Sequence, residues 1–250
     1  MAIYDVRSIS QVGTSEPFEL QMARGQIPGH SFNHKFGAVP QMSINTTGTI
    51  WDINDTLYPW SAFNTAGTLS VARASASDAD KTITIVGLDA NYNEISENVT
   101  LTAASGNLTT KSFIRVYRAF MFNGSATNVG DINVTKGGTT VLRITAGKGQ
   151  TLMAIYTVPA NYTAYLTQSV MTIQDGGDAT GDMFVRYGGE TAFRIGHTFE
   201  VASSEYHYGF SVPIRLPEKS DVDIRAAVRS NNARVTAAFD IILIKEQGPL

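Results

Sequence analysis

The sequence predicts an all-β protein built as an antiparallel β-sandwich, either a jelly roll or an immunoglobulin-like fold. Apolar and polar residues alternate with period two from about residue 68 onward, and no window of helical length carries an amphipathic stripe. Gly, Asn and Asp punctuate the chain at intervals of roughly 8–15 residues, as they do between the short strands of sandwiches. With 250 residues, of which 43% are hydrophobic, the chain can bury one large β domain or two small ones.

The clearest element is a β-hairpin. Residues 82–88 and 94–101 alternate β-branched and polar side chains, and the loop 89–93 between them is rich in Asp and Asn. The same criteria predict strands over 112–122, 131–135, 140–145, 151–158, 162–173, 183–187, 192–201, 206–214, 222–227 and 235–244.

The beginning of the chain differs from the rest. Around 18–36, isolated apolar residues stand among Gly25, Pro28, Gly29 and Gly37 without sustained alternation, which predicts an irregular N-terminal arm over 1–46. Such an arm needs a partner surface, on its own domain or on a neighbouring subunit.

A second Gly-containing segment that favours a turn, Gly147-Lys148-Gly149, divides the remaining chain. It indicates either a boundary between two β-sandwich modules, 47–148 and 149–250 (the second jelly-roll-like), or a hairpin turn within one larger sandwich.

Composition excludes several classes of function. The balance of 19 Lys+Arg against 22 Asp+Glu gives no basic patch for nucleic acid, so we expect no nucleic-acid partner. The absence of cysteine excludes disulfides, thiolate metal sites and a cysteine nucleophile. The longest apolar runs, such as 241–244, are far shorter than the roughly 20 residues of a membrane helix. Asp5 and Arg7 interrupt the start of the chain, so we expect no secretory leader.

Two histidines, His30 and His34, stand four residues apart, a spacing that would place two metal ligands on one face of a helix. The neighbouring Pro28 and Gly29 argue against a helix, and no Glu follows His30 as in hydrolytic zinc motifs. We therefore interpret both as loop histidines that form hydrogen bonds, and expect no metal or other cofactor.

The Gly-rich segment 175–182 contains Asp175, Asp178 and Asp182, which resembles a calcium-binding loop. It lacks the alternating oxygen donors and the distal Glu of an EF-hand, so a turn between two strands is the alternative.

No catalytic constellation is evident. No Ser occupies a Gly-x-Ser-x-Gly turn, and Glu200 and Glu205, which flank an expected turn, fit exposed hairpin ends better than the facing carboxylates of a retaining glycosidase. We expect a protein without enzymatic activity.

Four aromatic residues gather in a loop-like stretch over 50–63: Trp51, Tyr58, Trp60 and Phe63. They either plug one end of a sandwich or form an interface anchor, because Trp and Tyr concentrate binding energy at contacts. With His30 and His34, they are the candidate interface residues.

Several segments of the chain resemble a family of virion structural proteins from tailed bacteriophages, marine phages and cyanophages among them. The resembling segments are 23–31 (ARGQIPGHS), 87–97 (GLDANYNEISE), 112–116 (SFIRV), 149–160 (GQTLMAIYTVPA) and 217–226 (PEKSDVDIRA). They are turns and strands rather than catalytic motifs, and the resemblance extends from about residue 20 to 245.

The resemblance implies a β-sandwich component of the virion, assembled in the cytoplasm of the bacterial host, and leaves its position in the virion open. Our leading interpretation is a capsid decoration or cement protein that stabilises the head through interfacial contacts. Its partners would be copies of itself, as a trimer or other cyclic oligomer, and the major capsid protein or other virion proteins. The alternative is a tail, baseplate or fibre component that binds a host-surface glycan through the aromatic residues of 51–63 or the 175–182 loop.

Overall fold

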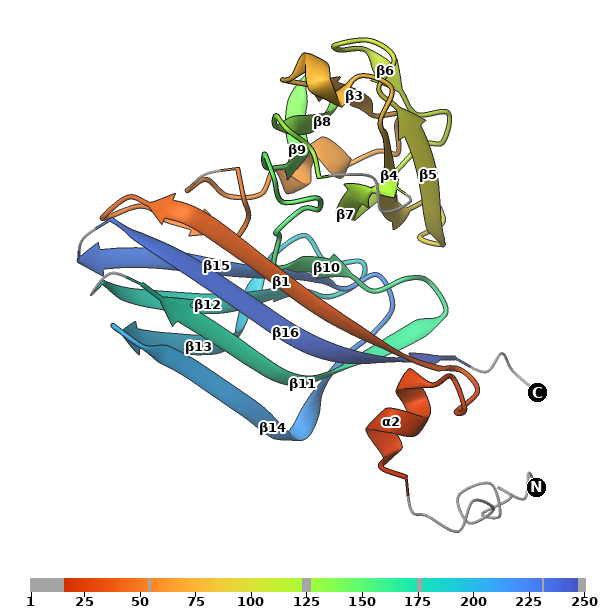
Figure 1. Cartoon of the computed structure of the whole chain (residues 1–250). Helices are drawn as coiled ribbons and strands as arrows, with labels where there is room; N and C mark the ends of the chain where they lie inside the picture. Colours follow the sequence, from red (N-terminus) through yellow and green to blue (C-terminus); the bar gives the residue numbers. More distant parts are fainter. Residues whose placement is uncertain (1–15, 54, 123–126, 175–176, 231, 247–250) are drawn as a thin grey trace.

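A computed structural model describes residues 16–53, 55–122, 127–174, 177–230 and 232–246. Strands make up 57% of the chain and helices 6%, and every sheet is antiparallel, which confirms the predicted fold class. Figure 1 shows two bodies, a larger sandwich and a smaller β module beside it.

The larger body has two sheets. The first contains, in order, β1 (His30–Met42), β16 (Ala233–Lys245), β11 (Tyr162–Ile173) and β14 (Glu205–Leu216). The second contains β10 (Ile155–Thr157), β15 (Asp221–Ser230), β12 (Asp178–Arg186) and β13 (Arg194–Ala202), with β2 (Thr47–Thr49) also paired to β15.

The order of these strands is that of a jelly roll. β2 and β10 pair with successive parts of β15, so together they act as one interrupted strand. Counted in this way, the first strand pairs with the last (β1 with β16), the second with the seventh, the third with the sixth (β11 with β14) and the fourth with the fifth (β12 with β13). This concentric pairing produces the two packed sheets of a jelly roll.

The smaller module is inserted between β2 and β10. One of its sheets is β6 (Asn107–Leu108), β3 (Ser70–Arg73), β8 (Ile132–Lys136) and β9 (Thr139–Ile144), and the other is β5 (Glu94–Thr100), β4 (Thr82–Leu88) and β7 (Arg115–Met121). Two short 3₁₀ helices, η1 (Trp60–Phe63) and η2 (Ala76–Asp78), lie in its connections.

The predicted hairpin is confirmed as β4 and β5. Asp89 shapes its loop, because the Asp89 carboxylate accepts hydrogen bonds from the backbone N–H groups of Asn91 (2.8 Å) and Asn93 (2.9 Å).

The prediction of an irregular arm is wrong for most of its described part. Residues Phe18–Ala23 form the helix α2, and β1 is a strand of thirteen residues paired with β16. Gly37 does not mark a turn, because it lies within β1. A Cβ there would lie 2.3 Å from the Ile50 carbonyl oxygen and 2.4 Å from the Ala154 nitrogen. Only glycine lets these three backbones approach so closely. β1 and β2 therefore belong to the same sandwich as 155–245, so the large sandwich is not confined to 149–250.

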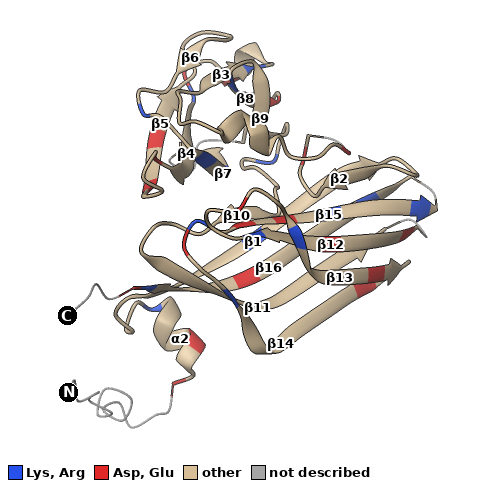
Figure 2. Cartoon of the chain, turned by 180° about the vertical axis from the view of Figure 1, so that it is seen from behind, with Lys and Arg blue, Asp and Glu red and all other residues tan. Residues whose placement is uncertain are grey.

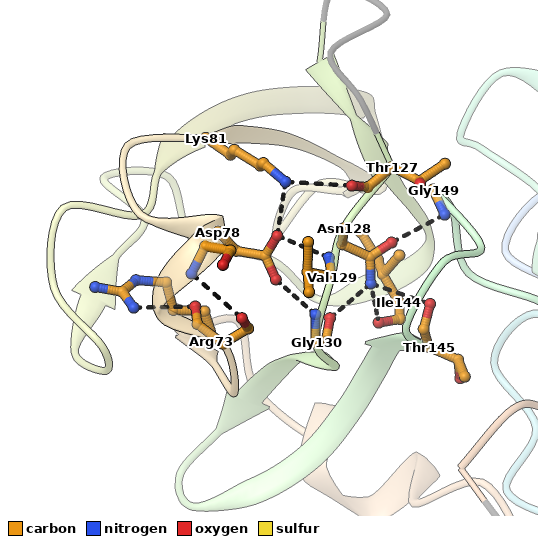
Figure 3. A network of polar contacts seen from close by, with 12 residues as sticks. Arg73, Asp78, Lys81, Thr127, Asn128, Val129, Gly130, Ile144, Thr145 and Gly149 are labelled. Carbon is orange, nitrogen blue, oxygen red and sulfur yellow. Dashed lines mark hydrogen bonds and ion pairs between the residues drawn. The ribbon is translucent and has the colours of Figure 1, made fainter.

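A buried polar network fixes the point where the chain leaves the small module (Figure 3). The Asn128 side chain donates to the carbonyl groups of Gly130, Ile144 and Thr145, and its oxygen accepts from the backbone N–H of Gly149 (3.0 Å). Beside it, the buried Asp78 carboxylate accepts from the N–H groups that follow Asn128 and from Lys81.

The segment after Gly149 is attached to both bodies. The N–H of Met121 donates to the Gly149 carbonyl and that of Thr151 to the Ala119 carbonyl, both in the small module. A few residues later, Ala154 donates to the Ile50 carbonyl at the edge of the jelly roll. Apolar side chains of both bodies also form one continuous cluster, so the two pack as a unit.

Candidate interaction surface

The four aromatic candidates lie inside the molecule. Trp51, Tyr58, Trp60 and Phe63 are each at most 9% exposed. The Tyr58 ring contacts those of Trp51 and Trp60 at centroid distances of 5.0 and 4.9 Å. Of the two alternatives that the sequence left open, the buried plug is therefore correct, and the interface assignment of these four residues is wrong.

A buried charged network holds this plug against the jelly roll. The Asp221 carboxylate accepts from Arg115 Nε (2.9 Å) and Nη2 (3.1 Å), and also from Arg186 Nε (2.9 Å). Asp223, two residues further along β15, accepts from the Trp60 indole N–H at 2.9 Å. Arg115 comes from β7, so these contacts join the two bodies. The sequence offered no direct signal for this network, because Asp221 and Asp223 occur within an ordinary strand pattern.

The two N-terminal histidines cannot share a metal ion. Both lie on β1, where a separation of four residues corresponds to about 13 Å. His30 Nδ1 is 3.1 Å from the Pro28 carbonyl oxygen, and His34 Nδ1 forms a hydrogen bond with the Asp240 carboxylate. The described residues contain no group of three His, Cys, Asp or Glu residues suited to a metal. An interface role of His30 and His34 stays a prediction.

The acidic segment 175–182 was expected to be either a calcium-binding loop or a turn, but from Asp178 onward it is a strand. Residues 175 and 176 lie outside the described part of the chain, and β12 begins at Asp178. The Asp182 carboxylate accepts from the Thr198 hydroxyl of the neighbouring strand at 2.9 Å. A Cβ at Gly181 would lie 2.2 Å from the Met171 sulfur in the core, so a larger residue there would require the Met171 side chain to move. Gly177 and Gly181, which indicated a loop, both lie close to core side chains.

One flank of the jelly roll is open. Edge strand β13 pairs with β12 and edge strand β14 with β11, and within the described ranges no strand covers the other side of either. Both edges lie on the side of the sandwich away from the small module (Figure 1). We call this surface, formed by β13 and β14, the open flank. Free backbone N–H and C=O groups on such edges are templates for further strand pairing.

A cluster of rings closes the space between the two sheets at the open flank. His197 lies at the centre, with centroid distances of 4.9 Å to Phe199, 4.8 Å to Tyr208 and 5.3 Å to Phe210. Phe199 is fully buried, whereas Tyr208 is 43% exposed. The pKa of His197 is lowered by burial, and its Nε2 has no hydrogen-bond partner among the described residues.

Large apolar side chains are exposed along the same flank. Ile195 on β13 is 56% exposed and Val212 on β14 is 81% exposed. In Figure 2 most of the ribbon of the two sheets is uncharged. Glu200 and Glu205, considered above as facing carboxylates, are exposed on β13 and β14. Pro213, which lacks an N–H, limits the part of β14 that can accept another strand. The open flank therefore combines free strand edges with an apolar surface.

No described helix is both long and apolar enough to cross a lipid bilayer.

No known protein-family profile matches the chain, and no curated protein matches it. Among solved structures, it shows weak similarity to broad bean stain virus, with 10% identity over 74% of this chain and 87% of the other and a TM-score of 0.22. For empty particles of cowpea mosaic virus the identity is 7% over 74% and 83%, with a TM-score of 0.22. For infectious bursal disease virus it is 8% over 88% and 76%, again with a TM-score of 0.22. Likeness at this level carries no argument for function.

Proposed function

We propose that this chain is a virion structural protein of a tailed bacteriophage that assembles through its open flank. The observation that carries the proposal is the open flank itself, where two free strand edges and exposed Ile195, Tyr208 and Val212 lie together. A second copy is the occupant, because symmetric self-association is the commonest way for a soluble protein to cover such a surface. The sequence resemblance to phage virion proteins supports the same proposal.

In its finer form, the protein decorates or cements the capsid exterior as a trimer or other cyclic oligomer, in contact with the major capsid protein, and catalyses no reaction. Each copy would contribute roughly 25 cal/mol for every Å² of apolar area buried, less the cost of ordering the partners. Many copies then stabilise a shell collectively.

The first test is the oligomeric state of the purified chain, measured by native mass spectrometry and by light scattering over a range of concentrations. We expect a defined oligomer that Ile195→Lys combined with Val212→Lys dissociates, because two ammonium groups would be forced into an apolar contact. The matched control is Leu108→Lys, which changes a residue that is 64% exposed on β6 of the small module. A wild-type chain that remains monomeric, or an equal loss with Leu108→Lys, would contradict assembly through the open flank.

The second test is the copy number in purified particles, measured by quantitative mass spectrometry. Hundreds of copies per particle are expected for a decoration protein. A dozen or fewer would instead indicate the alternative, a tail, baseplate or fibre component. Binding of a glycan by the aromatic residues of 51–63 no longer supports that alternative, because their rings are buried.

A further inference from the structure

A cleft of about 590 Å³ lies between β1 of the jelly roll and β7 of the small module. Its volume is in the range of small-ligand sites. Aromatic rings and polar side chains share its lining, among them Phe32, Phe36, Phe120, Lys35, Glu94 and Gln150. The cleft lies on the side of the jelly roll next to the small module, so it is separate from the open flank.

The cleft contains a buried cation, Lys35, that has no acidic partner among the described residues. The Lys35 side chain is 6% exposed, and its Nζ donates to the Tyr117 carbonyl oxygen and lies 5.4 Å from the centre of the Tyr117 ring. The charged neighbour that acts on it is Arg118, which has the same sign. Burial and this repulsion lower the pKa of Lys35 to about 7. An ammonium group has three donors, so Lys35 can bind an anionic group in addition to the carbonyl.

A second buried lysine shows what a purely structural arrangement looks like. Lys136 is 8% exposed and donates to two carbonyl oxygens, of Ala62 and Thr65, above the ring of Phe63. Lys35, with its one carbonyl acceptor, is less completely satisfied. An anionic ligand group would supply a further hydrogen-bond acceptor and a negative charge beside the Lys35 ammonium group.

The remaining groups in the lining suit a sugar ring. Phe32 is 48% exposed, so its ring is available for packing against a pyranose. The Arg118 guanidinium already covers one face of the Phe120 ring, 4.9 Å from its centre. Gln150 accepts a hydrogen bond from Arg118 at 3.3 Å, and Glu94 accepts one from the Tyr117 hydroxyl at 2.6 Å. These amide and carboxylate groups have remaining capacity for sugar hydroxyl groups.

We propose that the cleft between β1 and β7 binds an acidic sugar, with the carboxylate of the sugar on Lys35 and its ring against Phe32. An acidic peptide is the other source of a carboxylate. It is disfavoured because the lining alternates ring faces with groups that hydrogen-bond hydroxyls around a single buried cation. The proposal does not depend on assembly, so either can fail without the other.

The test is calorimetric titration of the folded wild-type chain with trigalacturonic acid, with the neutral maltotriose as the matched probe. We expect the acidic trisaccharide to bind at least about tenfold more tightly than the neutral one. Lys35→Met should weaken binding of the acidic probe by at least about tenfold, whereas Lys136→Met should leave it unchanged. Equal binding of both probes, no binding of either, or an equal loss in the two variants would overturn the proposal.

A second measurement keeps the proposal testable if Lys35→Met does not fold. Nuclear magnetic resonance of the wild-type chain with labelled lysine gives the pKa of Lys35 directly. Trigalacturonic acid should raise this pKa, because a carboxylate beside Nζ favours the charged form, and maltotriose should not. An unchanged pKa in the presence of the acidic probe, or equally tight binding of acetyl-Glu-Glu-amide, would overturn the assignment to an acidic sugar.

Discussion

The two flanks of the jelly roll are built differently. At the flank beside the small module, the Ala38 N–H donates to the Leu152 carbonyl and the Ala154 N–H to the Ile50 carbonyl, so the chain itself covers the strand edges. Buried charges and aromatic rings join the two bodies there. The open flank has the same two-sheet geometry, but its rings are partly exposed and its edges carry no further strand within the described residues.

The strand edges are therefore covered within the chain at one flank, and are open to a partner at the other. At the covered flank the buried Asp221 is paired with Arg115 and Arg186, and the buried Asp223 with Arg225. The open flank exposes the apolar side chains of Ile195 and Val212, which a second copy could bury, beside exposed charged residues of both signs. Three predictions test this contrast through stability, from the largest expected effect to the smallest.

The largest effect is expected for Asp221→Ala at the covered flank. The substitution leaves Arg115, which is 8% exposed, without its carboxylate partner in the interior. Removing one partner of a buried ion pair costs about 3–5 kcal/mol of unfolding free energy. Urea denaturation followed by circular dichroism measures the loss.

Asp182→Ala is the matched control, because Asp182 is a partly exposed carboxylate on the same sheet that accepts a single hydroxyl hydrogen bond. Its removal should cost no more than about 1 kcal/mol. Similar losses in the two variants would show that the Asp221 network does not hold the covered flank together.

The second prediction concerns Asp52, a buried residue whose carboxylate accepts from the Thr145 hydroxyl at 3.0 Å. Burial raises the pKa of Asp52 to about 7. Between about pH 4 and pH 7 the folded chain therefore binds more protons than the unfolded chain, so this group makes the unfolding free energy fall as the pH rises. Asp52→Asn should remove that fall and stabilise the chain at pH 8 by about 2–4 kcal/mol.

The measurement for Asp52→Asn is urea denaturation of both chains at pH 4 and pH 8. The difference between variant and wild type cancels the contributions of other titrating groups. A difference that is the same at both pH values would contradict the assignment of the raised pKa to Asp52.

The smallest effect is expected at the open flank, for His197→Phe. The imidazole Nε2 is buried without a hydrogen-bond partner among the described residues, so replacing the ring by an apolar one should stabilise the chain by about 1 kcal/mol at pH 7. Burial lowers the pKa of His197, so below about pH 6.5 the unfolded chain takes up the proton more readily and the wild type loses stability. The gain of the variant should therefore increase at pH 5.

Thermal unfolding at pH 7 and pH 5, at one fixed protein concentration, checks the His197 prediction. Tyr208→Phe, which removes a hydroxyl from the same ring cluster without removing a titrating group, is the control. A gain for His197→Phe that is independent of pH would contradict the expected protonation.

The sequence predicted elements well where local pattern and tertiary pairing agree. The predicted strand 162–173 has the same bounds as β11, and the hairpin of β4 and β5 was evident from its Asp- and Asn-rich loop. It failed where glycine serves close packing rather than a turn. Gly37 in β1 and Gly181 in β12 lie against backbone or a core side chain, and this reason becomes visible only when the distant segments are placed beside them.

The candidate site was harder to predict for the same reason. The aromatic residues of 51–63 were identified, but whether they faced solvent depended on Asp221, Asp223 and Arg115, which lie far away in sequence. The open flank depends on which strands end each sheet, and Lys35 depends on the cleft formed by the inserted module. None of these properties is local, so no pattern of neighbouring residues could reveal them.

The pairing of β1 with β16 also determines the order in which the molecule can be completed during synthesis. β1 leaves the ribosome early, yet its hydrogen-bonding partner lies at the other end of the described chain. Until β16 has emerged, β1 lacks this partner, whereas every described strand of the inserted module has already been synthesised. The pairing of β1 with β16, which joins segments about 200 residues apart, can therefore form only after nearly all of the described chain has been synthesised.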